Sequence, residues 1–224
     1  MKKNAATRRQ LVYASLLACY CWLGIYSIPS IAADPEEMEA LDKSKIKNKI
    51  DWSKPVVSRG FGYEAQSKAD QPFEAQYRQG QVAYFFGERG KAFIIWKALA
   101  EKGHAQSQAS LAWMYYAGLG TEKNLQKAFE FYQKAAEKNN AIAQNNLGTM
   151  YENGVFVKKD LAKASALYKL SAENGYRFGE FNYANALLAG WGGKIDKQSA
   201  RIWYQKAADQ DVPQAKDKLA KMKE

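Results

Sequence analysis

The residue types that most often carry chemistry are few in this chain of 224 residues. It contains one histidine, His104, and two cysteines, Cys19 and Cys21. No second histidine and no cysteine or carboxylate cluster stands at metal-ligand spacing from His104, which we expect to be a surface or second-turn residue. Both cysteines lie in a predicted targeting segment, and its removal leaves no thiol for a disulfide, a zinc site or a nucleophile. The sequence therefore predicts no catalytic residue, no metal site and no cofactor.

Two glycine-rich stretches raise the question of a phosphate-binding loop. They are "GLG" at residues 118–120 and "GWGG" at residues 190–193. Neither is followed by the Lys-Ser/Thr pair of such a loop, and neither follows a strand-like segment. The stretches recur at a fixed spacing, which indicates loop closure between two helices. The carboxylates of Asp209 and Asp211 fall at a predicted helix end, where capping accounts for them.

The charge is moderately basic and spread along the chain. There are 33 lysines and arginines against 23 acids, a formal net charge of +10. Four of the basic residues precede Asp34 and no acid does, so the rest carries 29 basic and 23 acidic groups. This balance suits an anionic envelope surface or an acidic partner. We exclude nucleic acid as a partner because there is no arginine-rich run, aromatic RNA-binding signature or finger spacing.

Residues 1–33 have the order of a bacterial secretory signal: a basic start, an apolar run and small residues before an acidic segment. Ser30 and Ala32 stand at the small-residue positions for a cut before Ala33, and a cut after Ala33 fits nearly as well. Residues 34–72 are rich in charge, glycine and proline, so we expect a partly disordered linker.

Alternatives to cleavage remain open. The apolar run at 11–31 approaches the ~20 residues that span a bilayer, which allows an inner-membrane anchor. "LLAC" resembles a lipidation motif ending at Cys19, and "TRRQLV" resembles a twin-arginine signal. Each alternative delivers the rest of the chain across the inner membrane, so we expect a periplasmic or secreted protein, or an anchored one with its following segments in the periplasm.

The chain repeats itself at a shift of 36 residues. Four positions are identical in three successive windows: Gly118, Gly154 and Gly190; Ala128, Ala164 and Ala200; Tyr132, Tyr168 and Tyr204; Ala136, Ala172 and Ala208. This predicts an array, with repeats at 73–104, 105–140, 141–176 and 177–212 and a capping helix at 213–224.

Each repeat is predicted to be a helix A, a glycine-bearing loop, a helix B and a tight turn. Asn124, Asp160 and Asp196 precede the B helices as N-caps. The B helices stop at Gly103, Asn139, Gly175 and Asp211. On helix B the alanines and the tyrosine share one face, and on helix A the buried side carries Leu111, Leu147 and Tyr183 with Tyr115, Tyr151 and Leu187. One pair of helices cannot bury both faces, so the units must stack.

The stretch "AIAQNNLGTMYENGVFVKKDLAKASALYKLSAENG" resembles the Sel-one-like repeat (SLR), a relative of the tetratricopeptide repeat. The matching residues are Ala143, Leu147, Gly148, Tyr151, Gly154, Val157, Asp160, Lys163, Ala164, Tyr168, Ala172 and Gly175. The resemblance implies an all-α fold, a right-handed α/α superhelix of about four helix-turn-helix repeats plus a C-terminal capping helix. It also implies a non-catalytic adaptor. One branch, the cysteine-rich proteins of Helicobacter, has members reported to bind or hydrolyse β-lactams, but that branch carries a disulfide in each repeat.

In such a superhelix the helix A face that is not used for packing lines the concave side. The candidate partner-binding residues on it are Ser110, Trp113, Asn146, Thr149, Asn153, Asn182 and Asn185. Asparagine amides can donate and accept hydrogen bonds along an extended peptide backbone. Trp113, with help from Met114 and Met150, is the predicted apolar anchor. The alternative is an ordinary solvated helix face.

The function predicted from these observations is a non-catalytic adaptor of the bacterial cell envelope. Its partner would be another envelope or secreted protein, or a peptide segment of one. Two alternatives are a β-lactam-binding or β-lactamase-like hydrolase, and a cell-wall glycan binder that contacts peptidoglycan through basic and aromatic residues.

Overall fold

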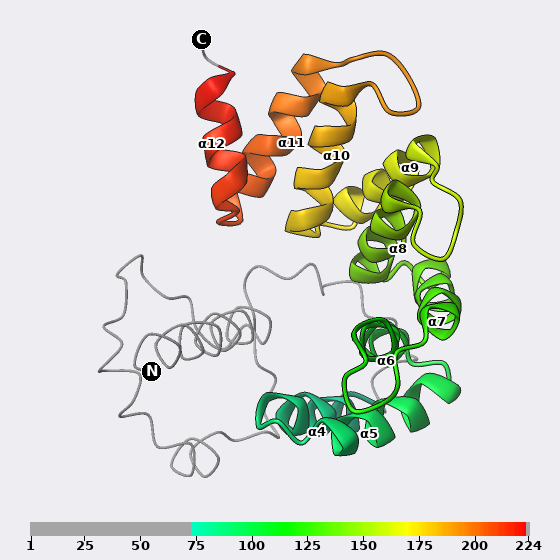
Figure 1. The fold of residues 1–224 in the computed structure, drawn as a ribbon. Helices are drawn as coiled ribbons and strands as arrows, with labels where there is room; N and C mark the ends of the chain where they lie inside the picture. The colour runs from blue at the N-terminus through cyan, green and yellow to red at the C-terminus, as the bar shows by residue number, and fades with distance from the viewer. Residues whose placement is uncertain (1–72, 223–224) are drawn as a thin grey trace, which may run out of the picture. The chain divides into compact units, whose positions relative to one another are not determined.

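The computed structural model describes residues 73–222, which form α-helices joined by turns and loops, with no strand in that range (Figure 1). The predicted leader and linker, residues 1–72, lie outside the described residues. In chain order the helices are α4 (Glu74–Phe85), α5 (Arg89–Glu101), α6 (Ala105–Ala117), α7 (Leu125–Glu137), α8 (Ala141–Asn153), α9 (Leu161–Glu173), α10 (Arg177–Ala189), α11 (Lys197–Asp209) and α12 (Pro213–Lys221). The prediction of an all-α fold is confirmed.

The helices pack in series. Each helix contacts the next one along the chain, and α10 also contacts α8. The even-numbered helices are the predicted A helices and the odd-numbered ones the B helices, so the described part is a solenoid of helix pairs closed by α12 (Figure 1). Among residues 73–222 no helix is long and apolar enough to cross a membrane.

The helix starts are held by the predicted caps. The side chains of Asn124, Asp160 and Asp196 each accept a hydrogen bond of 2.9 Å from a backbone N–H in the first turn of their B helix. These bonds satisfy amide groups that have no partner within the helix. A fourth cap, Asn140, does the same for α8 through the N–H of Ala143.

The helix ends also follow the prediction. The A helices α6, α8 and α10 end at Gly118, Gly154 and Gly190, whose φ angles are 68°, 68° and 69°. The B helices are followed by residues with φ of 90°, 60°, 75° and 59°, namely Gly103, Asn139, Gly175 and Asp211. Left-handed backbone at these positions turns the chain at the same place in each repeat.

The core holds one large aromatic side chain of helix B in each repeat. Trp96, Tyr132, Tyr168 and Tyr204 are all fully buried. Ala128, Ala164 and Ala200 beside them are also buried, as predicted, and let the helices approach closely. One detail differs from the prediction: in α7 the buried alanine is Ala135, while Ala136 is only partly buried.

Small residues eight positions apart meet where α7, α9 and α11 each pack on the helix that follows. The pairs are Ala135 with Ala143, Ser171 with Gly179, and Ala207 with Ala215. A Cβ atom on Gly179 would lie 2.2 Å from Ser171 Oγ, so the larger residue on one helix is matched by a smaller one on the other. The Ser171 hydroxyl donates to the Ala141 carbonyl oxygen at 2.6 Å.

Side chains in the turns after the B helices reach back to earlier residues, two of them to the preceding repeat. Lys138 Nζ donates to the Gly103 carbonyl oxygen, and Gln210 Nε2 donates to the Gly175 carbonyl oxygen at 3.2 Å. Asn174, at the equivalent position between them, instead donates at 2.9 Å to Gln144 Oε1 of its own repeat. Neighbouring repeats are therefore tied by polar contacts on the side of these turns.

His104 is not the surface residue that the sequence suggested. Its side chain is fully buried, with Nδ1 2.8 Å from Ser107 Oγ and Nε2 3.7 Å from Glu74 Oε1. The rings of Phe73 and Tyr77 contact it at centroid distances of 5.7 and 5.2 Å. The prediction failed because α4 and the residue before it cover this turn, a contact that the sequence around His104 does not show.

Candidate partner-binding face of the A helices

The predicted site residues lie along one stripe of the A helices, at matching positions in α6, α8 and α10. We call this stripe the A-helix face. It has three predicted rows, and a fourth row begins at the N-terminal end of each helix. The residues in chain order are Gln106, Ser110, Trp113 and Ala117 on α6; Ile142, Asn146, Thr149 and Asn153 on α8; Phe178, Asn182, Asn185 and Ala189 on α10.

The polar residues of this face are bonded to the tyrosines of the B helices. Asn146 Nδ2 donates to the Tyr132 hydroxyl at 3.1 Å, and the Tyr204 hydroxyl donates to Asn185 Oδ1 at 2.7 Å. Burial raises the pKa of Tyr204 to about 12, so its hydroxyl remains a donor at neutral pH. These amides therefore orient the core tyrosines, a role that the sequence analysis did not predict.

Thr149 occupies the same position for Tyr168. Its Oγ1 lies 3.1 Å from the Tyr168 hydroxyl, which also donates to Glu152. Burial is the main cause that raises the pKa of Tyr168, and the neighbouring Glu152 adds to it. The periodic spacing could have revealed these pairs, because Tyr168 follows Thr149 by 19 residues and Tyr204 follows Asn185 by the same interval.

Ser110 is not available to a partner. It is 4% exposed, and its hydroxyl lies 3.2 Å from that of Tyr77 on α4. Burial raises the pKa of Tyr77 to about 12. The fourth-row residue of α6 is also buried, since Gln106 is 7% exposed. The open part of the A-helix face therefore lies on α8 and α10, with Trp113 at its edge.

The asparagines of α8 and α10 are held by hydrogen bonds that leave one amide group of Asn182 and one of Asn185 unused. Asn182 Nδ2 donates to Asn145 Oδ1 at 2.8 Å, and Asn153 Nδ2 donates to the Thr149 carbonyl oxygen at 3.0 Å. Among the contacts of the described residues, the carbonyl oxygen of Asn182 and the NH₂ group of Asn185 take no part in these bonds. One acceptor and one donor thus stand three residues apart on a partly exposed helix face.

Trp113 is the predicted apolar anchor and is 41% exposed. Its ring stacks on Tyr116 with a centroid distance of 5.9 Å, and its Nε1 donates to the Tyr84 hydroxyl at 3.3 Å. Met114 and Met150 do not help it, because both are buried in the core. A neighbouring helix position points about 100° away, which places Met114 on the packing side.

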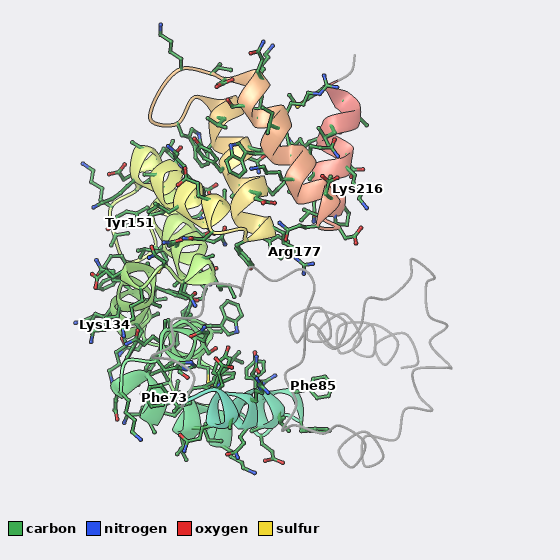
Figure 2. The ribbon with its side chains drawn as sticks, turned by 180° about the vertical axis from the view of Figure 1, so that it is seen from behind. Phe73, Phe85, Lys134, Tyr151, Arg177 and Lys216 are labelled. Carbon is green, nitrogen blue, oxygen red and sulfur yellow. The ribbon has the colours of Figure 1, made fainter. Side chains whose placement is uncertain are left out.

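A second apolar group was missed by sequence reasoning. Phe178, in the fourth row, is 38% exposed, and Ile142 stands at the equivalent position of α8. Arg177, labelled in Figure 2 at the start of α10, holds its guanidinium carbon 5.0 Å from the Phe178 ring. The period of 36 that gave the other rows would also have given this one.

The chemistry of this face is that of recognition. Within residues 73–222, no group of three or more His, Cys, Asp and Glu side chains could hold a metal ion. What the face presents is a set of oriented amides between two exposed aromatic rings, Trp113 and Phe178. Such a surface can hydrogen-bond a peptide backbone and receive apolar side chains.

Comparison with known proteins was made by family and by structure. The family model described as Sel1 repeat matches residues 105–140, 141–176 and 178–212. A search of the curated proteins found no significant match.

Several solved structures are similar to the chain. One is a protective antigen present in uropathogenic Escherichia coli strains that displays an SLR fold; the identity is 29%, the TM-score is 0.59, and the match covers 66% of this chain and 32% of that one. Another is a Sel1 repeat protein from Oxalobacter formigenes, with 31% identity, a TM-score of 0.54 and coverage of 57% of this chain and 96% of that one. The chain thus spans less than half of the length of the Escherichia coli protein and nearly all of the Oxalobacter protein.

Proposed function

Because the chain belongs to the Sel1 repeat family, whose members are generally scaffolds for protein–protein interaction, we propose that it is a non-catalytic adaptor that binds an extended segment of another protein on its A-helix face. The observation that carries this proposal is the unused acceptor of Asn182 and donor of Asn185 on a partly exposed face. An extended backbone presents N–H and C=O groups that fit this pair without regard to sequence.

The internal bonds of these amides favour binding. Asn182 is held by Asn145, and Asn185 by the hydroxyl of Tyr204. A side chain that is already fixed loses little conformational entropy when a ligand arrives. The role of the asparagines in the core and the proposed role in binding are therefore compatible.

The two exposed aromatics define the segment that would fit. Trp113 lies on α6 and Phe178 on α10, two repeats apart. At about 8–10 Å for each step between packed helices, the way from α6 over α8 to α10 takes at least about six residues of extended chain at ~3.3 Å per residue. We expect a partner segment with two bulky apolar residues at about this separation.

Peptide selection on the full chain tests the binding face. Peptides would be selected from a random displayed library on the wild-type protein, and their affinity for variants would be measured by fluorescence anisotropy. Trp113→Ala and Phe178→Ala remove the anchors. Asn182→Asp keeps the acceptor oxygen of residue 182 and removes the NH₂ group that donates to Asn145 Oδ1. The matched control is Ile202→Ala, which removes an exposed apolar side chain from the B helix α11.

We expect Trp113→Ala and Phe178→Ala each to weaken binding about tenfold or more with little change in Tm, as for other interface anchors. The control should bind as the wild type does. If the anchor variants bind as tightly as the control, the A-helix face is not the binding site.

We also propose that the adaptor works in the cell envelope, with another envelope or secreted protein as its partner. The support is the order of residues 1–33, with a basic start, an apolar run and a small-residue cleavage motif. Protease added to spheroplasts would digest the repeats only if they lie outside the inner membrane. N-terminal sequencing of the mature protein would separate cleavage near Ala33 from an intact anchor.

A further inference from the structure

The loop between helices α8 and α9 differs from its two counterparts at one backbone position. Gly120 and Gly192 have φ angles of 70° and 75°, and Phe156, at the same place in the repeat between them, has a φ of 66°. Left-handed backbone is unfavourable for a residue with a Cβ atom and costs glycine nothing. A loop that served only the fold would carry glycine here, as the other two do.

Burial of the Phe156 side chain offsets little of the cost of its left-handed backbone. It is 50% exposed, and its ring contact in the described structure is with Phe129, at a centroid distance of 5.6 Å. An exposed aromatic ring on strained backbone is the kind of feature that is retained for function.

The loops lie along one edge of the stack. A Cβ atom on Gly120 would lie 2.6 Å from the carbonyl oxygen of Arg89, and one on Gly192 would lie 3.3 Å from Cα of Ala162. Each of these loops thus rests on the start of the B helix in the preceding repeat. Figure 1 shows the α8–α9 and α10–α11 loops projecting beyond the ends of their helices.

This edge combines positive charge with exposed apolar groups. We call it the loop edge and define it by the exposed residues Lys123, Phe156, Lys158, Lys159, Lys194 and Ile195. Ile195 is 62% exposed. Within residues 73–222, Lys158, Lys159 and Lys194 form no ion pair. The acids of the three loops are Asp160 and Asp196, which accept hydrogen bonds as helix caps, and the exposed Glu122 beside Lys123, so the four lysines outnumber the acids by one.

We propose that the loop edge is a docking surface for an anionic lipid bilayer. Phe156 and Ile195 enter the interfacial region of the bilayer, and the lysines beside them contact the acidic headgroups. A soluble acidic partner would satisfy the lysines alone, whereas an exposed phenylalanine on strained backbone fits insertion. The surface is separate from the A-helix face, so the two proposals can fail independently.

Hydrogen exchange of the intact chain on vesicles reads the loops directly, even if residues 1–33 also contact lipid. The protein is mixed with vesicles of phosphatidylcholine and phosphatidylglycerol, with vesicles of phosphatidylcholine alone, and with soluble polyaspartate. We expect slower exchange at residues 155–159 and 191–195 on the mixed vesicles only, and no change at the opposite turns, residues 138–140. Loops that stay unprotected on mixed vesicles, or that polyaspartate protects equally well, would overturn the proposal.

Variants separate the lipid contact from a role in the fold. Lys158→Ser with Lys159→Ser removes two charges, and the matched control, Lys97→Ser with Lys169→Ser, removes two exposed lysines from the B helices. We expect the loop variant to lose the protection of residues 155–159 and the control to keep it. Phe156→Gly should lose the same protection without lowering Tm. Protection that persists in both loop variants would contradict the proposal.

Discussion

The repeats at 141–176 and 177–212 have the same backbone plan although most of their aligned side chains differ. Both have an aspartate cap, a buried tyrosine and a left-handed glycine after helix A. They differ where Gln144 is replaced by Glu180, where Thr149 is replaced by Asn185 and where Phe156 is replaced by Gly192. The comparison shows that the backbone plan depends on a few periodic positions, while the positions between them are free to acquire other roles.

The largest expected effect concerns the buried tyrosine that the two repeats share. Tyr168→Ala and Tyr204→Ala each remove a fully buried ring, and we expect each to lower the free energy of unfolding by about 3–5 kcal/mol. Tyr168→Ala should cost more, because the Tyr168 hydroxyl contacts both Glu152 and Thr149, whereas among residues 73–222 the Tyr204 hydroxyl contacts Asn185 alone. Urea unfolding followed by circular dichroism measures both values. A larger loss for Tyr204→Ala would show that these hydroxyl contacts do not stabilise the fold.

A smaller effect tests the matched pair between the two repeats. Gly179→Ala places a methyl group against Ser171 and should destabilise the chain by about 1–3 kcal/mol. Adding Ser171→Ala should recover only part of that loss, because the new Cβ atom would still lie 2.6 Å from Cβ and 2.9 Å from the backbone carbon of residue 171, and the hydrogen bond to Ala141 is lost. A double-mutant cycle gives the coupling energy. Additive losses would mean that the two sites do not compensate each other.

In contrast to the substitutions above, we expect a substitution of Glu180 to raise the stability of the chain. Its side chain is 4% exposed and accepts a hydrogen bond of 2.9 Å from Gln210. Burial raises the pKa of Glu180, and Asp209 adds to this, while the bond from Gln210 and the charge of Lys206 lower the pKa. Gln144, at the equivalent position, donates to a carbonyl oxygen of the preceding B helix at 3.3 Å, which an ionised Glu180 cannot do. We expect Glu180→Gln to stabilise the chain at pH 7 by about 1 kcal/mol.

The same substitution has a pH signature. The pKa of Glu180 is higher in the folded chain than in the unfolded one, so the folded state binds its proton more tightly. The contribution of Glu180 to stability therefore rises as the pH falls through the raised pKa towards the unfolded value of ~4.3. The advantage of Glu180→Gln should shrink over that range. Urea midpoints measured from pH 7 to pH 4 would show it, and a constant difference would contradict it.

The smallest effect concerns the loops. Phe156→Gly removes the cost of left-handed backbone but loses the contact with Phe129, so we expect a change in stability of less than about 1 kcal/mol. The reciprocal Gly192→Ala should destabilise by about 1 kcal/mol, because its new Cβ meets Ala162 on left-handed backbone. Thermal unfolding of the two variants measures both. A large loss with Phe156→Gly would mean that the phenylalanine serves the fold.

The sequence predicted best the features that depend on local chemistry. The caps at Asn124, Asp160 and Asp196, and the left-handed stops, follow from backbone groups that each helix end leaves unsatisfied. Repetition made them visible, because a single cap or stop is a weak signal and three at one spacing are not.

The features that depend on contact between helices were predicted less well. His104 is buried because α4 covers it, and the bonds of Asn146 and Asn185 to tyrosines form only when helix B reaches across to helix A. The exposed Phe178 at the end of the A-helix face was missed because the alignment at a shift of 36 was used for three rows and not for the fourth, which contains it. Periodicity identifies a face, but the depth of each side chain depends on its neighbours.

The backward contacts of Lys138, Asn174 and Gln210 have a mechanical consequence. Lys138 and Gln210 tie neighbouring repeats by hydrogen bonds on the side of the turns, and Asn174 ties the end of α9 to α8 within one repeat. On the other side, the loops at Gly120 and Gly192 lie against the preceding B helix. We expect a stack held in this way to open less easily on the side of the turns than on the side of the loops. We expect shorter or longer side chains in place of Lys138 and Gln210 to change the tilt between repeats, so the curvature of the solenoid can change in evolution without alteration of its buried core.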